Sequence, residues 1–111
     1  MVQHQARLDD TFAALSDPTR RGILERLGRG NASISELAAS FAMSLTGLKK
    51  HVQILEEAGL VVTEKVGRVR TCRLGPRRLD DESAWIDRYR QMLEDRYDRL
   101  EEFLERTKGD L

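Results

Sequence analysis

The residues of this sequence best suited to chemistry form a polar run from Ser44 to Gln53. Lysine side chains can contact phosphates or guanine edges, a glutamine amide can pair with adenine, and a threonine offers a hydroxyl and a methyl group. A glycine permits close approach of the backbone, and a serine at a helix start leaves N–H groups for a phosphate. We therefore expect nucleic-acid contacts from the outward-facing members of this run, which are Ser44, Thr46, Gly47, Lys49, Lys50 and Gln53.

Other chemistries find little support in the sequence. Cys72 is the one cysteine, which excludes an internal disulfide, and the histidines are His4 and His51. A transition-metal site needs soft or imidazole ligands in a cluster, and no such cluster is visible. We also find no nucleophile paired with a base and no glycine loop that could cradle a phosphate. We expect no enzyme activity, no cofactor and no metal site.

The polar run belongs to a helix whose other face can pack into a core. Leu48, Val52 and Leu55 share one helical face, Ser44 can cap the helix start, and Gly59 can end it in a left-handed conformation. A shorter helix precedes it, because the segment 33–36 has the S-x-x-E form of a capping box. Only about three residues separate these two helices, which predicts a helix-turn-helix pair.

Two helices precede this pair and a β-hairpin follows it. The first helix is expected from Leu8 to Ser16, and the second begins at Asp17-Pro18 and stops near Gly28. The runs 60–65 and 69–74 are rich in Val and Thr and flank a three-residue loop, 66–68, which predicts a hairpin.

Basic residues gather on this hairpin. Arg68 and Arg70 stand at or beside its tip, with Lys65 and Arg73 nearby. Such residues can reach backbone phosphates or an adjacent minor groove. The alternative is an edge strand that charge protects against aggregation.

A long amphipathic helix is expected from about Asp81 to Arg106, where no Gly or Pro interrupts the sequence. Its apolar residues recur at three- and four-residue steps over a length that a small domain cannot cover. Ordinary packing within the chain is one explanation, and it suits the segment around Trp85. For the rest we expect pairing with the first helix and with a second copy of the chain. The expected homodimer interface comprises Leu8, Phe12, Leu15, Tyr89, Met92, Leu93, Tyr97, Leu100, Phe103 and Leu104.

Length and charge fit this organisation. The 111 residues suit one domain, 1–111, with dimerisation helices at 1–16 and 80–107 around a central part, 17–76. The net charge of zero hides an asymmetry, because residues 1–76 hold 11 Lys/Arg against 8 Asp/Glu and residues 77–111 hold 8 against 11. Without a secretory signal or a membrane-spanning stretch, we expect a cytoplasmic protein.

Three motifs resemble the ArsR-type winged helix-turn-helix repressors of bacteria. The segment 15–21, LSDPTRR, is similar to the opening of that family's second helix. The segment 43–61, MSLTGLKKHVQILEEAGLV, is similar to its reading helix, and 67–74, GRVRTCRL, to its wing. The resemblance adds Leu45 to the expected DNA contacts and makes His51 a structural or phosphate-facing residue. The cysteine and histidine ligands of the metal-sensing members are missing here, so the chain resembles the subgroup without them.

The expected fold is therefore mostly α-helical with a small β-hairpin wing: a dimeric winged helix-turn-helix with five helices. The expected function is sequence-specific binding of double-stranded DNA as a homodimer on a palindromic operator, to repress transcription. A winged-helix scaffold for protein–protein contacts is the alternative. The sequence leaves a small-molecule inducer open, and Cys72 is expected to be a small hydrophobic residue of the wing.

Overall fold

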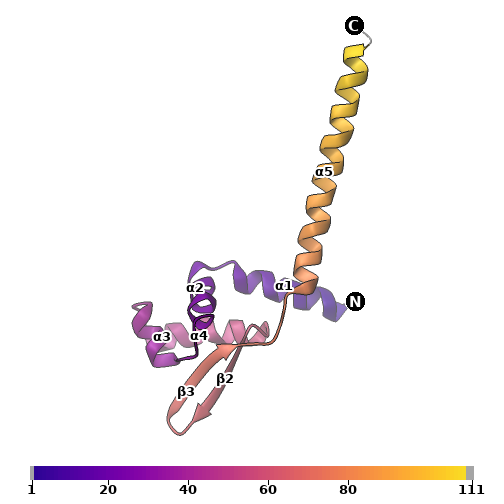
Figure 1. Cartoon of the computed structure of the whole chain (residues 1–111). Helices are drawn as coiled ribbons and strands as arrows, with labels where there is room; N and C mark the ends of the chain where they lie inside the picture. Colours follow the sequence, from indigo (N-terminus) through magenta and orange to yellow (C-terminus); the bar gives the residue numbers. More distant parts are fainter. Residues whose placement is uncertain (1, 110–111) are drawn as a thin grey trace. The chain divides into compact units, whose positions relative to one another are not determined.

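The structure, a computed structural model, describes residues 2–109 and contains five helices and three strands within that range (Figure 1). Residues 1, 110 and 111 of the expected domain, and the side chain of His4, lie outside the described part. In chain order the elements are α1 (Val2–Leu15), α2 (Pro18–Leu27), β1 (Ala32–Ser33), α3 (Ile34–Ser40), α4 (Leu45–Glu57), β2 (Val61–Val66), β3 (Val69–Leu74) and α5 (Asp80–Gly109). The chain divides into two compact units, residues 1–78 and 79–111.

The first unit is built around α4. The three residues expected to face the core, Leu48, Val52 and Leu55, are at most 1% exposed. Ile23 of α2 and Leu37 of α3 are also fully buried. Burial of such side chains stabilises a fold by about 1.5–3 kcal/mol each relative to exposure. The buried face of α4 therefore fixes which of its other residues face outward.

The predicted helix starts are confirmed by their caps. The Asp17 carboxylate accepts a hydrogen bond from the backbone N–H of Arg20 at 3.1 Å, and Pro18 opens α2. The Ser33–Glu36 capping box is reciprocal, with both hydrogen bonds at 3.1 Å. Ser44 accepts from the backbone N–H of Gly47 at 3.0 Å and caps α4. Because each cap satisfies an N–H group that the helix leaves unpaired, these residues set where the helices begin.

Three boundaries differ from the prediction by more than one residue or by a change of pairing. Helix α5 ends at Gly109 rather than Arg106. Helix α1 begins at Val2 rather than Leu8, because no capping residue or apolar repeat marks the polar segment that precedes Leu8. The hairpin loop has two residues, Gly67 and Arg68, rather than three, so Val66 pairs with Val69. Gly67 has a φ of +64°, which suits the first central position of a tight hairpin turn.

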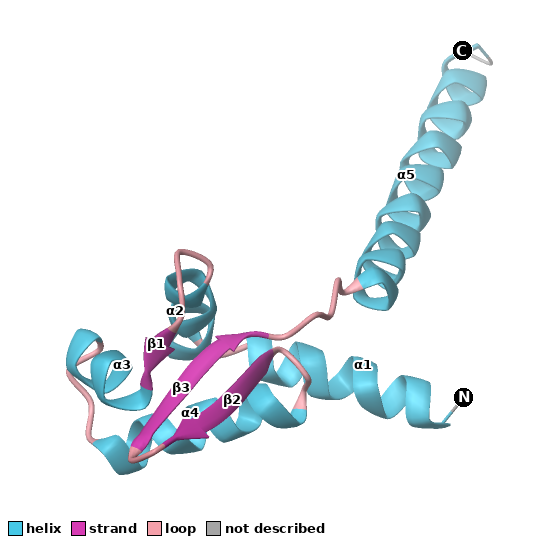
Figure 2. Cartoon of the chain, turned by 60° about the horizontal axis from the view of Figure 1, so that its bottom comes forward, coloured by secondary structure: helices cyan, strands magenta, loops and turns pink. Residues whose placement is uncertain are grey.

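The hairpin is part of a three-stranded antiparallel sheet of order β1-β3-β2 (Figure 2). The sequence did not predict β1, because two residues are too short for a periodic pattern. Ala32 of β1 pairs with Cys72, and Ser33 with Thr71. The distal part of the hairpin therefore continues beyond β1 as a two-stranded ribbon.

Helix α1 buries a face that the sequence pattern did not single out. Thr11 and Ala14 are fully buried, whereas Leu8, Phe12 and Leu15 are half-buried. The Arg77 guanidinium donates to the Thr11 hydroxyl at 2.6 Å and to the Ala58 carbonyl at 2.7 Å. A polar residue can occupy this buried site because its hydroxyl is hydrogen-bonded.

The second unit consists mainly of α5, which has 30 residues and a length of about 45 Å. The rings of Trp85 and Tyr89 stack with their centroids 5.8 Å apart. The large apolar side chains between Met92 and Leu104 are mostly exposed, for example Tyr97 at 66%. In the described part of the chain, no helix combines the length and the apolar character needed to cross a membrane.

Candidate nucleic-acid interface

Helix α4 presents most of the predicted contact residues to solvent. The side chains of Ser44, Leu45, Thr46, Lys49, Lys50 and Gln53 are all exposed. Gly47 is half-buried, and a Cβ atom there would lie 3.2 Å from the Ser44 Oγ atom and 3.4 Å from the Met43 Cε atom. The missing side chain at Gly47 therefore avoids crowding against Ser44 and Met43 at the start of α4.

The exposed residues of α4 divide between two sides of the helix. Thr46, Lys50 and Gln53 follow one another at four- and three-residue steps and share an outer side. Leu45 and Lys49 share a side that faces the wing, and Lys49 borders the outer side because it lies three residues from Thr46 and four from Gln53. Glu56, two turns beyond Lys49, also faces the wing because its carboxylate accepts a hydrogen bond from Thr63 of β2 at 2.9 Å.

A groove of about 480 Å³ lies between α4, the start of α3 and the wing. Its lining consists of Ser33, Ile34, Ser35, Leu45, Lys49, Lys65, Arg68, Val69 and Arg70. We call it the basic groove, because four of these nine residues are cations and none is an acid. It brings together Lys49, Arg68 and Arg70, which the sequence analysis placed in two separate elements, and it adds Lys65.

The alternation of β2 explains which wing residues enter the basic groove. Cross-strand partners point to the same face of a sheet. Thr63 pairs with Cys72, and Lys65 pairs with Arg70. Because Cys72 is fully buried, this is the face that covers the core. Lys65 and Arg70 lie further toward the tip on the same face.

A chain of hydrogen bonds connects this face to α4. The Arg70 guanidinium donates to the Thr63 hydroxyl at 2.9 Å. That hydroxyl in turn donates to the Glu56 carboxylate at 2.9 Å. Sequence analysis assigned no role to Thr63 or Glu56, since neither residue type at these positions indicates a DNA contact. On the outer side of α4, the Gln53 amide donates to Glu57 at 3.3 Å.

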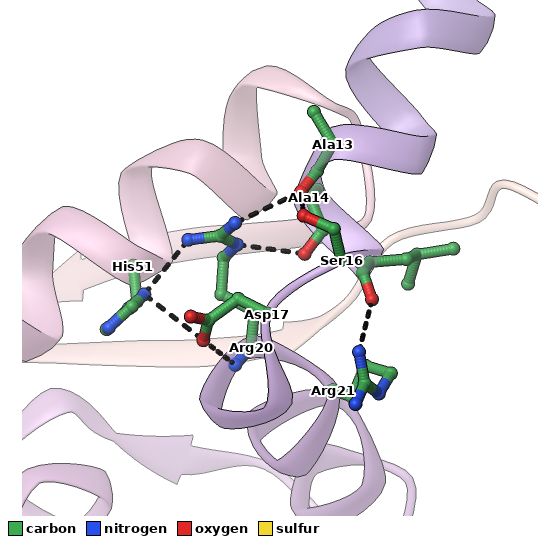
Figure 3. A network of polar contacts seen from close by, with 8 residues as sticks. Ala13, Ala14, Ser16, Asp17, Arg20, Arg21 and His51 are labelled. Atoms are coloured by element: carbon green, nitrogen blue, oxygen red, sulfur yellow. Dashed lines mark hydrogen bonds and ion pairs between the residues drawn. The ribbon is translucent and has the colours of Figure 1, made fainter.

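A polar network at the start of α2 holds α1, α2 and α4 together (Figure 3). The Arg20 guanidinium donates to the carbonyls of Ala14 at 2.8 Å and Ala13 at 3.0 Å, at the end of α1. It also lies 3.2 Å from the Nδ1 atom of His51 on α4. The same nitrogen lies 3.9 Å from the Asp17 carboxylate. His51 is thus structural, one of the two roles expected for it.

The charge of Asp17 is stabilised within this network. The Asp17 carboxylate accepts a hydrogen bond from the backbone N–H of Arg20, and this bond lowers the Asp17 pKa below its usual range. The charges of Arg20 and His51 act in the same direction. The LSDPTRR segment is therefore a helix junction. Its aspartate caps α2, and its first arginine binds the free carbonyls of α1.

Cys72 is buried in the sheet, as expected of a small hydrophobic residue. Burial raises the pKa of its thiol to about 11, and the nearby Glu56 charge adds to the shift. A thiol of this kind is a poor nucleophile at neutral pH. Among the side chains that the structure describes, no three His, Cys, Asp or Glu residues are grouped so that they could hold a metal ion.

Known proteins share this architecture. Residues 15–64 match a family model described as a helix-turn-helix domain. The HTH-type transcriptional regulator Rv2034 of Mycobacterium tuberculosis is 35% identical over 81 residues, which cover 73% of this chain and 76% of the relative. The transcriptional repressor SdpR of Bacillus subtilis is 30% identical over 79 residues, 71% of this chain and 88% of the relative.

Solved structures of transcriptional regulators have the same fold as this chain. The crystal structure of an ArsR family transcriptional regulator is 42% identical, with a TM-score of 0.74 over 81% of this chain and 93% of that one. An ArsR-like transcriptional regulator from Rhodococcus sp. RHA1 is 34% identical, with a TM-score of 0.72 over 89% of this chain and 93% of that one.

The fold, the exposed side of α4 and the basic groove define a winged helix-turn-helix DNA-binding protein. With relatives at this identity and coverage, the chain belongs to the ArsR family of transcriptional regulators. This confirms the fold, the family and the DNA-binding function expected from the sequence. These relatives are regulators of transcription rather than enzymes.

Proposed function

We propose that this protein represses transcription as a homodimer that binds a palindromic operator. The observation that carries the proposal is the basic groove, which is lined by cations from both the wing and α4. These are Lys65, Arg68 and Arg70 of the wing and Lys49 of α4. The relative from Bacillus subtilis, itself named a transcriptional repressor, supports repression over activation. The proposed site of action is the cytoplasm.

Helix α4 is the element proposed to enter the major groove. Its outer side carries Thr46, Lys50 and Gln53, whose side chains can donate to or accept from base edges. Ser44 caps α4, Gly47 lies in its first turn, and both are proposed to contact the DNA backbone. Arg68 at the wing tip is proposed to contact phosphates or the adjacent minor groove.

The proposed dimer interface uses apolar side chains of α5 and α1. Met92, Tyr97 and Phe103 are each more than half exposed, which is unusual for a series of large apolar residues on one helix. A second copy of the chain would bury them. The complete proposed set is Leu8, Phe12, Leu15, Tyr89, Met92, Leu93, Tyr97, Leu100, Phe103 and Leu104. Two-fold pairing would place two α4 helices about 34 Å apart, one turn of DNA.

The DNA part of this proposal is tested by selecting preferred duplexes from a random library and then titrating the best one against salt. We expect a palindromic consensus and an affinity that falls steeply as salt rises, because several phosphates are contacted. A flat salt response without sequence preference would contradict the proposal and favour a protein-interaction scaffold.

The dimer part is tested with Leu100→Glu, which places a charge among the apolar residues of α5. We expect a monomer by light scattering. We also expect binding to the palindrome at least about 100-fold weaker, because two linked half-sites bind far more tightly than one. Glu102→Lys, elsewhere on the same helix, is the matched control and should remain dimeric. A dimeric Leu100→Glu variant would contradict the proposed interface.

A further inference from the structure

The neighbouring lysines of α4 have different surroundings. One residue along a helix turns the side chain by about 100°. Lys49 lines the basic groove with Lys65 and Arg70 of the wing, whereas Lys50 is not part of that lining. Lys50 instead follows Thr46 by one turn on the outer side of α4. The two lysines therefore lie on different surfaces, Lys49 in the basic groove and Lys50 on the outer side of α4.

The lining of the basic groove suits a phosphate rather than a base edge. Four cations from two elements converge there, and no acid in the lining offsets them. Like charges held close together repel, so the free groove favours an anion. Ser35 adds a hydroxyl that can donate a hydrogen bond, and a phosphate accepts several such bonds at once. A base edge presents no net charge.

We propose that the basic groove holds a backbone phosphate of the bound DNA, with Lys49, Lys65 and Arg70 as its ligands. This inference rests on the proposed function and assigns separate tasks to the two lysines. Lys49 contributes affinity that is independent of sequence, and Lys50 reads a base. The sequence analysis gave both the same role.

Thr63 is the positioning residue of this phosphate site. Its hydroxyl has one O–H group, which donates a hydrogen bond to the Glu56 carboxylate, so its lone pairs are left to accept a hydrogen bond from Arg70. The direction of both hydrogen bonds is therefore fixed. An arginine held in this way loses less conformational freedom when DNA binds than one that moves freely.

The matched variants Lys49→Ala and Lys50→Ala test the division of tasks. Affinity is measured for the selected palindrome and for a scrambled duplex over a series of salt concentrations. For Lys49→Ala we expect an equal loss on both duplexes and a salt slope smaller by about two, because each protomer of the homodimer loses one phosphate contact. For Lys50→Ala we expect the preference for the palindrome to fall by about tenfold.

Two results of these titrations would overturn separate claims. If the wild-type protein prefers the palindrome and Lys49→Ala abolishes that preference, the phosphate site is wrong while the proposed function stands. If the wild-type protein shows no preference for any duplex, the proposed function itself fails. Palindromes with one neutral methylphosphonate at the same position of each half-site locate the contact. At one such position, the losses from Lys49→Ala and Arg70→Ala should both disappear. Losses that persist at every position would overturn the phosphate site.

The positioning role is tested with Thr63→Val, which keeps the shape and removes the hydroxyl, and with Thr63→Ser, which keeps the hydroxyl. We expect Thr63→Val to weaken binding of both duplexes severalfold and Thr63→Ser to bind like the wild type. In an Arg70→Ala background, Thr63→Val should cause no further loss. An equal loss with and without the Arg70 side chain would show that Thr63 acts only on the fold.

Discussion

Replacement of Arg20 by alanine should destabilise the protein more than replacement of any exposed arginine by alanine. The guanidinium donates to the carbonyls of Ala13 and Ala14 and lies within hydrogen-bond distance of His51. Hydrogen bonds to charged groups contribute about 1.5–3 kcal/mol each, and bonds from one side chain are not additive. The positive charge also lies at the carbonyl end of α1, where a helix favours cations. We expect a loss of about 2–4 kcal/mol in the free energy of unfolding.

Urea unfolding followed by circular dichroism measures this loss. Protein concentration must be the same throughout, because the stability of a dimer depends on it. Arg20→Lys should recover less than half of the loss, since one ammonium cannot reach acceptors that a planar guanidinium spans. Arg29→Ala, which removes an exposed arginine, should change stability by less than about 0.5 kcal/mol. If Arg20→Ala lost less than about 1 kcal/mol, the network would not hold the three helices together.

Three further predictions concern the first unit. Gly75→Ala should cost about 1–3 kcal/mol in thermal unfolding, because a Cβ atom there would lie 2.5 Å from the carbonyl oxygen of Gly59. Hydrogen bonds from the backbone N–H groups of the caps lower the pKa values of Asp17 and Glu36 in the folded protein. The stability that these two carboxylates contribute is complete above their ordinary pKa values of about 4 and is lost as the pH falls further. In unfolding titrations at a series of pH values, the double variant Asp17→Asn with Glu36→Gln should therefore lose less stability below about pH 4 than the wild type. The Cys72 thiol, with its pKa raised to about 11, should react with a thiol reagent at pH 8 at least about 100-fold more slowly in the native than in the unfolded protein.

Local signals in the sequence were sufficient to predict most of the fold. Asp17, Ser33 and Ser44 each cap a helix where their residue type and spacing indicated. These predictions succeed because a cap depends only on residues within one turn. Strand β1 was missed for the opposite reason: Ala32 and Ser33 are extended through pairing with Cys72 and Thr71, which lie far away in the sequence.

Part of the candidate site was also predictable from local patterns in the sequence, and part was not. Helical periodicity predicted that Lys49, Lys50 and Gln53 are exposed, and they are. It did not predict that Lys49 would share a groove with the wing while Lys50 would not, because the position of the wing depends on tertiary packing. Thr63 was missed since its role comes from partners on another strand and another helix. The DNA contacts of Lys49, Lys50 and Gln53 and the dimer interface remain predictions.

A net charge of zero does not argue against DNA binding by this protein. Electrostatic attraction acts over about 8–10 Å at physiological salt, so a polyanion responds to local charge rather than to the sum over the chain. The basic groove gathers Lys49, Lys65, Arg68 and Arg70 without an acid in its lining. Glu56, the acid of the hydrogen-bond network, lies outside this lining and accepts a hydrogen bond from the Thr63 hydroxyl. In this arrangement a carboxylate orients a cation, and the affinity for phosphate depends on where the charges lie.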